Sequence, residues 1–418
     1  MNFWLEMKVY KFGGASVKDA EGIRNVLRIV SREKGDLIIV VSAMGKTTNA
    51  LERVVNARWE NCEDVALSEY AAIRNQHQAI AKELGLSQTV QQALFATNLV
   101  SDIPFVDNYD LFYDQIVCTG ELNSSRLLSA YLNANGVENE LLMMPQLLIT
   151  DTTYREAKVN MTVSAENVRQ AIGQSNARVF VTQGFIGGTP DKHFTTLGRE
   201  GSDYSAALLA NFIDAESVTI WKDVPGILNA DPRLVENTIL IPELSYSEAV
   251  ELAYSGAQVI HPKSIRPVEN KKIPLYVRPF NAPDEAGSVI CEINKRVNVP
   301  VYIWRKNQLL ITMKAKDFSF ILEESLSAIF DIINRHRLKV SLIQSSAVTI
   351  SVCVDNTRYV PDAIKELSKA FAVTYNDGLS LLTIRGTSPE ILAREQANRE
   401  ILLTQTTRRT ARIVVKEG

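Results

Sequence analysis

Hydrophobic and polar positions alternate from Met7 to Phe12, which is the two-residue period of a β-strand. After Gly13-Gly14 the period becomes that of a helix face, with apolar residues at Ile23, Val26, Leu27 and Val30. Ser16, followed three residues later by Asp19, resembles a capping box and predicts the helix N-terminus. A strand, a glycine turn and a helix N-terminus offer unpaired N–H groups and a positive dipole end to an anion. The segment predicts a phosphate site beside Lys11, although a Gly-Gly turn also joins ordinary strands to helices.

Two further segments have small or glycine residues that lead into a helical pattern. A strand-like run from Leu37 to Val41 ends in small residues and leads into a helical pattern after Ala50. The segment Gly198 to Asp203 precedes another helical pattern, whose apolar face is Ala206, Leu209, Ala210 and Ile213. Strand ends that carry glycine, hydroxyl and charge are typical of ligand binding at the carboxyl edge of a doubly wound α/β sheet.

Two better-known phosphate loops are excluded. Gly45-Lys46-Thr47 is not a Walker A motif, because its first glycine would fall on Val40 inside a strand-like run. No G-x-G-x-x-G opens a helix in this sequence.

Helical and strand patterns alternate up to Arg278 to Pro283, a Pro- and Asn-rich stretch that predicts a domain exit. Glu52 to Leu99 is rich in Ala, Gln and Glu and predicts a helical insertion. Beyond Val301 we expect a β-α-β-β-α-β module of ferredoxin-like order. Its elements are Leu309–Lys314, Ser325–Arg337, Lys339–Ile343, Val348–Val354, Val360–Ala370 and Ala372–Tyr375.

A second, shorter module follows. We expect a strand at Ser380–Ile384, a helix at Pro389–Arg399 and a strand at Ala411–Val415, with Val301–Trp304 as its first strand. The sequence stops before a second helix.

Composition narrows the function classes. The chain has 418 residues, 46% of them hydrophobic, which is enough for a sizeable core. A net charge of -3 gives no electrostatic footprint for nucleic acid or an anionic membrane. Cys62, Cys118, Cys291 and Cys353 are scattered, which indicates buried thiols in a reducing compartment. No apolar run has transmembrane length and no leader pattern opens the sequence, so a cytoplasmic protein is expected.

Seven blocks resemble, in order, those of the aspartokinases. They are KFGGASV (11 to 17), VVSAMGKTTN (40 to 49), TGELNSS (119 to 125), QGFIGG (183 to 188), TLGREGSDYSA (196 to 206), WKDVPGILNADPR (221 to 233) and SGAQVIHP (255 to 262). The C-terminal part resembles the paired ACT modules that regulate those enzymes. The resemblance implies an α/β fold: a three-layer amino-acid kinase fold with a largely parallel central sheet, followed by α+β ferredoxin-like ACT modules.

The implied domains are a catalytic domain at 7–292 and a regulatory ACT region at 301–418. The first ACT module would span about 309–378, and the second, truncated, about 301–308 plus 379–418. Family members with such a tail dimerise through the first module and bind an amino-acid effector at the interface, so a homodimer is expected.

The implied reaction transfers the γ-phosphoryl group of ATP to the β-carboxylate of L-aspartate. The product is 4-phospho-L-aspartate, and the reaction is the first step of lysine, threonine and methionine biosynthesis. A carboxylate with a pKa near 4 is already ionised, so the reaction needs no general base. ATP is the implied cofactor with Mg²⁺ bound through its phosphates, and no side chain is expected to bind a metal.

The resemblance also assigns site residues. Lys11 and Asp203 would be catalytic, with Asp203 orienting Lys11, and Gly13, Gly14 and Ser42 would contact phosphate. The residues implied for aspartate are Thr48, Glu121, Phe185, Arg199 and Ser202. Arg199 offers a bidentate fork to the α-carboxylate and Glu121 a counter-charge to the ammonium. Without the family, a surface arginine and a helix-start carboxylate remain the alternatives.

The nucleotide side would be built from Lys222, Asp223, Leu228, Arg233, Gln258 and Lys263. Asp231-Pro232-Arg233 is equally well interpreted as a turn with a solvated arginine. Gln258 departs from the family, which usually has a phosphate-contacting lysine there, and Lys222 and Lys263 are the candidates to compensate.

Two further departures concern Ala15 and Ser341. Ala15 replaces the usual threonine after Gly14, which removes a hydroxyl near the phosphates. Ser341 stands where lysine-sensitive members carry an aspartate, so weak or absent inhibition by lysine is expected.

Two alternative functions stay open at this point. One is another amino-acid kinase, acting on glutamate or acetylglutamate. The other is a catalytically silent ACT-type amino-acid sensor, motivated by Gln258.

Overall fold

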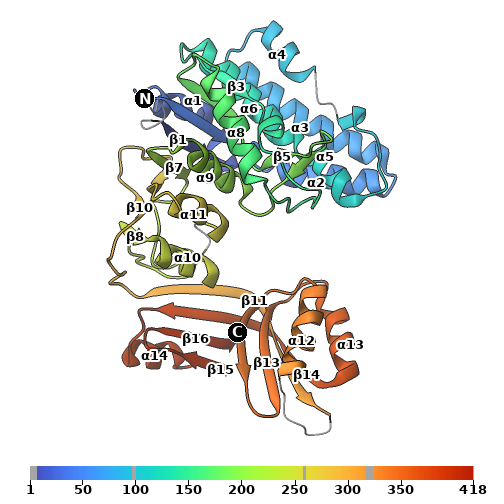
Figure 1. The fold of residues 1–418 in the computed structure, drawn as a ribbon, viewed down its shortest axis with the longest axis vertical. Helices are drawn as coiled ribbons and strands as arrows, with labels where there is room; N and C mark the ends of the chain where they lie inside the picture. Colours follow the sequence, from blue (N-terminus) through green and yellow to red (C-terminus); the bar gives the residue numbers. More distant parts are fainter. Residues whose placement is uncertain (1–6, 97–99, 258–259, 317–322, 418) are drawn as a thin grey trace. The chain divides into compact units, whose positions relative to one another are not determined.

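The structure is a computed structural model that describes residues 7–96, 100–257, 260–316 and 323–417 (Figure 1). The chain forms two compact units. The first contains residues 1–227, 240–253 and 258–296, and the second contains 228–239, 254–257 and 297–418. The short segments 228–239 and 254–257 therefore cluster with the C-terminal residues, although the sequence places them inside the domain expected at 7–292.

An eight-stranded sheet in the order β3-β4-β2-β1-β7-β9-β10-β8 forms the centre of the first unit. Its strands are β1 (Lys8–Phe12), β2 (Leu37–Val41), β3 (Glu140–Leu142), β4 (Val179–Gln183), β7 (Ser217–Lys222), β8 (Glu243–Ser245), β9 (Leu275–Pro279) and β10 (Ser288–Cys291). Its neighbouring strands pair in parallel, except β9 and β10, which are antiparallel. The expected α/β class with a largely parallel central sheet is confirmed.

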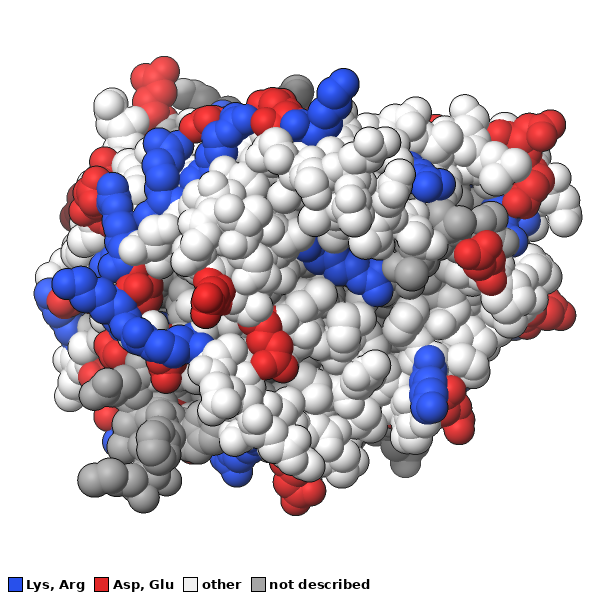
Figure 2. Space-filling model, turned by 90° about the horizontal axis from the view of Figure 1, so that it is seen from above, with Lys and Arg blue, Asp and Glu red and all other residues white. Residues whose placement is uncertain are grey.

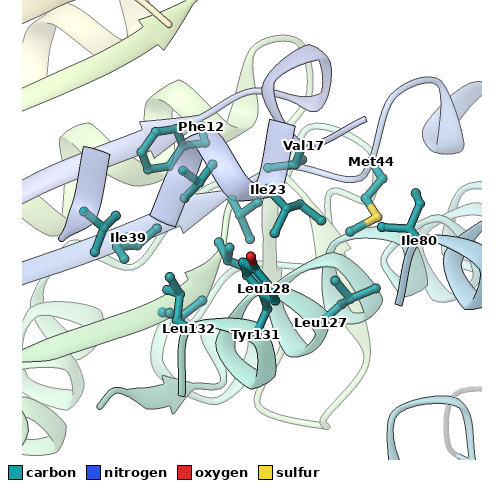
Figure 3. Packing of buried hydrophobic residues seen from close by; sticks show 14 of the residues in the cluster. Phe12, Val17, Ile23, Ile39, Met44, Ile80, Leu127, Leu128, Tyr131 and Leu132 are labelled. Atoms are coloured by element: carbon teal, nitrogen blue, oxygen red, sulfur yellow. The ribbon is translucent and has the colours of Figure 1, made fainter. Parts of the chain in front are cut away.

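Helices cover both faces of this sheet, which gives the expected three layers. On one face, α1 (Ala20–Val30), α3 (Glu63–Glu83), α4 (Gln88–Phe95) and α6 (Thr119–Ala134) pack against the strands. Figure 3 shows this core, where Phe12 and Ile39 of the strands meet Ile23, Leu128 and Leu132. On the other face, α9 (Gly201–Ile213) contacts β1, β2 and β7, and α8 (Met161–Gly173) and α11 (Pro262–Glu269) pack against α9.

The remaining elements of the first unit are short or peripheral. They are η1 (Gly14–Val17), α2 (Thr47–Trp59), η2 (Val100–Asp102), α5 (Tyr109–Val117), α7 (Met144–Leu147), the β5 (Ile186–Gly188) and β6 (Phe194–Thr196) hairpin, and α10 (Tyr246–Ser255), whose last residues cluster with the second unit.

The first helix begins later than the sequence pattern predicts. Its N-cap is Asp19, whose Oδ1 accepts a hydrogen bond from Gly22 N at 2.8 Å, and Ser16 is not the cap. Ser16 N instead donates to Gly13 O at 2.9 Å, which closes the short η1 turn. A Cβ on Gly22 would lie 2.3 Å from Ser16 O, so the turn and the helix approach each other as closely as glycine permits.

The second unit is built on a six-stranded antiparallel sheet in the order β12-β13-β11-β14-β16-β15. Its elements are β11 (Val301–Ala315), α12 (Glu323–Arg335), β12 (Val340–Ser345), β13 (Thr349–Asp355), α13 (Val360–Ala370), β14 (Phe371–Arg385), α14 (Pro389–Gln396), β15 (Ile401–Thr406) and β16 (Thr410–Lys416). The β-α-β-β-α-β order expected for the first module is observed.

Three features of this sheet differ from the expectation. The strands expected at Val301–Trp304 and Leu309–Lys314 are one continuous strand, β11. The strands expected at Ala372–Tyr375 and Ser380–Ile384 are one continuous strand, β14, which pairs with β11 along both halves. Gly378, with φ +62°, lies between them, where the register of the pairing with β11 shifts before the pairing resumes. The strand β15 was not expected, because its sequence, ILLTQT, at the edge of the sheet lacks a clear alternation of apolar and polar residues.

Candidate active site

Lys11, Asp203 and Lys222 form a buried charged cluster in the first unit. The alternation along β1 puts Phe12 in the core of one face and Lys11 on the face that α9 covers. Lys11 Nζ lies 2.6 Å from Asp203 Oδ1, and Lys222 Nζ, at the end of β7, lies 3.3 Å from Asp203 Oδ2. Asp203 is 2% exposed, so two ammonium groups share one desolvated carboxylate.

This arrangement decides the charge state of Asp203. Burial disfavours its ionised form, but the ammonium groups of Lys11 and Lys222 outweigh burial and hold the pKa of Asp203 below its ordinary value. Asp203 is therefore ionised at neutral pH, and it faces the Nζ atoms of both lysines.

The glycine turn after β1 lies directly beside this cluster. A Cβ on Gly13 would lie 3.4 Å from Lys11 Nζ. A Cβ on Gly14 would lie 2.7 Å from Ala43 O, so the turn packs against the segment after β2 at a distance that only glycine allows. Ser42 is in that segment, is half-buried, and its N–H donates to Phe12 O at 3.1 Å. The structure brings Lys11, Gly13, Gly14 and Ser42 together at one edge of the sheet.

Glu121, in the first turn of α6, has an unsatisfied oxygen. Its Oε1 accepts a hydrogen bond from Ala43 N at 3.2 Å, whereas its Oε2 is buried without a hydrogen-bond partner. Burial raises the pKa of Glu121 to about 8, against the opposing effect of the Ala43 N–H. Thr48 is half-buried in the first turn of α2. Its neighbour Thr47 packs against the start of α6, where a Cβ on Gly120 would lie 3.5 Å from the Thr47 side chain. A bound ammonium would satisfy Glu121 Oε2.

Phe185, Arg199 and Ser202 lie on two segments that pack against each other. A Cβ on Gly184 would lie 2.6 Å from Ser202 Cβ, and one on Gly201 would lie 2.7 Å from the ring of Phe185. Phe185 adopts φ +69°, and its N–H donates to Ser205 Oγ at 3.0 Å. Arg199 is exposed, and no carboxylate in the described part of the chain forms an ion pair with it. Its guanidinium can therefore receive an incoming carboxylate.

The remaining expected nucleotide residues are spread over both units. Asp223 is exposed directly after β7, and Lys263 is exposed in the first turn of α11. Leu228 and Arg233 belong to the second unit, where Arg233 is exposed and pairs with Asp231 at 2.6 Å. Gln258 lies outside the described residues. Of the two candidates to compensate for it, Lys222 contacts Asp203, whereas no ion pair between described residues joins Lys263 to the cluster.

Glu200 is a site residue that the sequence reasoning missed. It is the N-cap of α9, in the left-handed conformation with φ +54°, and its Oε2 is buried without a hydrogen-bond partner. Burial raises the pKa of Glu200 against the attraction of Lys222, Arg199 and Lys11. A carboxylate between Arg199 and Asp203 in the block at 196–206 was visible in the sequence, but its missing partner is a property of the folded chain alone.

Three other features of the described residues bear on which ligands the protein could bind: the charge of its surface, metal-ligating clusters and membrane-spanning helices. On the face drawn in Figure 2, basic and acidic side chains stand close together in small groups, and uncharged areas lie between these groups. No three His, Cys, Asp or Glu side chains in the described ranges gather as a preformed metal site. None of the described helices is both long enough and apolar enough to span a membrane.

Comparison with known proteins assigns this arrangement to a family. A profile described as the amino acid kinase family matches residues 6–279. The chain is also 30% identical over 402 residues to lysine-sensitive aspartokinase 3 of Escherichia coli, covering 91% of this chain and 87% of that protein. The chain belongs to the amino acid kinase family, among the aspartokinases.

Solved structures agree with this family. The crystal structure of E. coli aspartokinase III in complex with aspartate and ADP, called the R-state, superposes with a TM-score of 0.82 at 28% identity. That match covers 98% of this chain and 96% of the other. The same enzyme in complex with lysine and aspartate, the T-state, gives a TM-score of 0.76. The bifunctional aspartokinase/homoserine dehydrogenase 1 of Arabidopsis thaliana is longer, and the chain covers 42% of it at 28% identity.

Proposed function

We propose that this protein is an ATP-dependent aspartate kinase. It transfers the γ-phosphoryl group of ATP to the β-carboxylate of L-aspartate and yields 4-phospho-L-aspartate, in the pathway to lysine, threonine and methionine. The observation that carries the proposal is the buried Lys11–Asp203–Lys222 cluster, which lies beside a glycine turn in an aspartokinase fold. We place the protein in the cytoplasm, in line with the biosynthetic role of such enzymes.

The cluster suits phosphoryl transfer to a carboxylate. The nucleophile is ionised at neutral pH, so the enzyme has to position two anions and stabilise the charge that spreads over the transferred group. Lys11 and Lys222 supply positive charge that Asp203 holds in place, and the N–H groups of Gly13 and Gly14 and the Ser42 hydroxyl complete the phosphate contacts. Fixed donors of this kind need no reorganisation during the reaction.

Aspartate would be recognised through both of its α-substituents. The unpaired Arg199 guanidinium offers two parallel N–H donors to the α-carboxylate. Glu121 Oε2 offers a buried acceptor to the ammonium. Thr48, Phe185 and Ser202 would provide the remaining contacts. An amino acid that lacks either charged group would leave Glu121 or Arg199 without its partner, which disfavours its binding.

The nucleotide would be held by Lys222, Asp223, Leu228, Arg233 and Lys263, with Lys222 the candidate to replace the positive charge missing at Gln258. Lys222 is already next to the catalytic carboxylate, which supports that role. Mg²⁺ on the nucleotide would neutralise phosphate charge during transfer.

We further propose a homodimer whose ACT region responds weakly, or not at all, to lysine. Ser341 Oγ accepts a hydrogen bond from Arg305 Nη1 at 2.9 Å, so the position that would need a carboxylate carries a hydroxyl beside a guanidinium. A guanidinium disfavours the approach of the lysine ε-ammonium.

A coupled ADP-release assay with MgATP tests the function. L-aspartate should support turnover, whereas L-glutamate and N-acetyl-L-glutamate should not. Faster turnover with glutamate or acetylglutamate than with aspartate would show that the substrate is assigned wrongly. No turnover with any of the three would favour the silent amino-acid sensor.

A further inference from the structure

Asp114, in α5, is a buried carboxylate that lies outside the charged cluster. Its side chain is 0% exposed, and it accepts hydrogen bonds from two segments that are distant from it in the sequence. Its Oδ2 accepts from Arg155 N at 3.0 Å and from Thr196 N at 2.9 Å, and its Oδ1 accepts from Thr196 Oγ1 at 2.8 Å. One side chain therefore ties the turn at 153–157 to the end of β6.

The charge state of Asp114 suits this role. Burial raises the pKa of Asp114 to about 6, although the hydrogen bonds from Arg155 and Thr196 oppose the effect of burial. The carboxylate is therefore ionised at neutral pH and accepts all three hydrogen bonds. Hydrogen bonds to a charged acceptor are stronger than those between neutral groups, so the two segments are held firmly.

The segment that follows Thr196 carries two of the side chains assigned to aspartate or their direct contacts. Leu197 N donates to Phe185 O at 2.9 Å, so the segment also fixes the backbone of Phe185. Arg199 follows two residues later. The hydrogen bonds at Thr196 are thus close in the chain to both residues.

The turn at 153–157 supports the same segment. Ala157 N donates to Thr196 O at 3.0 Å, and a Cβ on Gly198 would lie 3.2 Å from Arg155 O. Arg155 itself has φ +69°, a region that favours glycine, and the hydrogen bond from its N–H to Asp114 helps to hold it there. Loss of the Asp114 carboxylate would remove the anchor that the turn and the segment share.

The other proposed anchor of aspartate, Glu121, is attached to the same helix. Only Cys118 separates α5 from α6, in whose first turn Glu121 lies. Cys118 N donates to Asp114 O at 3.1 Å, and its buried Sγ lies 3.7 Å from Thr195 O. Asp114 therefore connects the helices that carry Glu121 to the segment that carries Arg199.

We propose that Asp114 is a positioning residue for the substrate, which fixes Arg199 relative to Glu121 so that both α-substituents of aspartate are bound at once. The inference rests on the proposed function in one respect, namely that these two residues bind the α-carboxylate and the ammonium. Asp203 depends less on Asp114, because α9 packs against β1, β2 and β7 and Asp203 pairs with Lys11. Loss of Asp114 should therefore act on aspartate binding more than on kcat.

The test compares Asp114→Ala and Asp114→Asn in the full chain, by steady-state kinetics with MgATP and by calorimetric titration of aspartate. Asp114→Ala removes every acceptor, so the KM and Kd for aspartate should rise at least about tenfold, since small displacements of positioning groups have large effects. The KM for ATP should stay close to that of the wild type. Asp114→Asn keeps one oxygen for the two N–H groups, and its NH2 group can donate to the Thr196 hydroxyl, so it should recover most of the affinity for aspartate.

A double-mutant cycle separates positioning from a general loss of structure. Because Asp114 acts through Arg199, Asp114→Ala should change the KM for aspartate less in an Arg199→Lys background than in the wild type. Asp110→Asn is the matched control: it removes a carboxylate of the same helix that contacts the side chain of Arg155 at 3.5 Å, and it should leave the KM for aspartate unchanged. Thr196→Val removes the hydroxyl donor alone and should raise the KM in the same direction by a smaller factor.

Unchanged KM and Kd for aspartate in folded Asp114→Ala would overturn the proposal. If that variant does not fold, unchanged aspartate affinity in Thr196→Val would overturn it instead. An equal loss of ATP affinity, or full additivity with Arg199→Lys, would also contradict it, since Asp114 would then act on the fold in general. A wild-type protein without aspartate-dependent ADP release would refute the kinase function separately, because the calorimetric titration of aspartate does not depend on turnover.

Discussion

Individual charges at the active site are balanced by neighbours rather than by solvent. Asp203 is buried between Lys11 and Lys222, and removing one lysine still leaves it paired with the other. Removing Asp203 would take away the carboxylate that both ammonium groups contact directly, which destabilises a fold much more. Lysine variants are therefore the better probe of catalysis.

Lys11→Met should lower kcat at least about 10²-fold, because one preorganised charge at such a site contributes about 2.7 kcal/mol or more to transition-state stabilisation. The fold should persist, since Asp203 keeps Lys222. Steady-state kinetics with aspartate and MgATP measures the effect, and circular dichroism checks the fold. Lys8→Met on the same strand is the control: Lys8 pairs with Glu33 at 3.2 Å, and its loss should leave kcat unchanged. Near-normal kcat in Lys11→Met would contradict the assigned role.

Glu121→Gln should raise the aspartate KM while it stabilises the protein. Because burial raises the pKa of Glu121 from 4.5 to about 8, the folded protein retains a proton that the unfolded chain releases between these pH values. The free energy of unfolding of the wild type therefore decreases as the pH rises through this window, by about 1.4 kcal/mol per unit at most. The variant should lack this loss, which denaturant unfolding at several pH values measures.

The same titration should appear in substrate binding. An ammonium binds the ionised form of Glu121, so the wild-type KM for aspartate should fall as the pH rises towards about 8 and then level off. Glu121→Gln should show a raised KM with little pH dependence over this range. A wild-type KM that is flat between pH 6 and about 8 would contradict the assignment.

At the residue scale, one contact expected from the sequence is observed, and the roles assigned to the site residues stay a prediction. Lys11 and Asp203 were expected together, and they form an ion pair. Lys222 was expected on the nucleotide side only, and its contact with Asp203 depends on how β7 and α9 meet. Glu200 could not be found from the pattern, because an unsatisfied buried oxygen exists only after packing.

At the scale of elements, glycines let the loops around the site approach one another. Gly14 packs against Ala43 O, Gly184 against Ser202, and Gly201 against Phe185. Each contact joins segments that are distant in the sequence. The geometry of the site therefore depends on positions without side chains as much as on the charged residues.

Gly14→Ala should destabilise the protein by about 1–3 kcal/mol, because its Cβ would lie 2.7 Å from Ala43 O and the backbone would have to shift. Activity should fall further than stability, since the shift displaces the turn beside Lys11. Thermal unfolding and kcat/KM measure the two effects. Ala15→Ser, at the exposed next residue, should change stability by no more than about 0.5 kcal/mol. Equal stability and equal kcat/KM of the two variants would show that the close approach of Gly14 to Ala43 O is unimportant.

At this scale, two expectations from the sequence were wrong, the start of the first helix and the absence of β15, and both depend on short local patterns. The helix after the glycine turn was placed at Ser16, but a capping pattern cannot distinguish a helix from the short η1 turn that precedes Asp19. The strand β15 escaped detection because an edge strand needs only one paired side and a weak apolar pattern.

At the scale of the whole molecule, the α/β class and the β-α-β-β-α-β order of the first C-terminal module agree with the expectation from the sequence, because strand and helix periods alternate there. The limits of the compact units did not follow. Residues 228–239 cluster with the C-terminal residues through contacts such as Tyr302 N to Asn229 O at 2.8 Å, which no local pattern announces. The domain limits at 7–292 and 301–418 stay a prediction.

Lysine should inhibit this enzyme weakly or not at all, because Ser341 provides a hydroxyl that Arg305 already occupies. The coupling free energy that separates regulated from unregulated enzymes is only about 1–3 kcal/mol, so loss of one charge-assisted contact is enough to remove the response. Titration of lysine, threonine and methionine into the kinase assay measures this. Half-inhibition by sub-millimolar lysine would contradict the expectation, and inhibition by threonine alone would reassign the effector.

The strand β14 belongs to both halves of the six-stranded sheet. Its first half completes the core with α12 and α13, and its second half completes the separate core beside α14. The register of its pairing with β11 shifts between the two halves, but the strand itself is continuous, so we expect the two halves to unfold together. The second unit should therefore behave as one cooperative folding block, with amides in both halves of β14 exchanging hydrogen at matched rates.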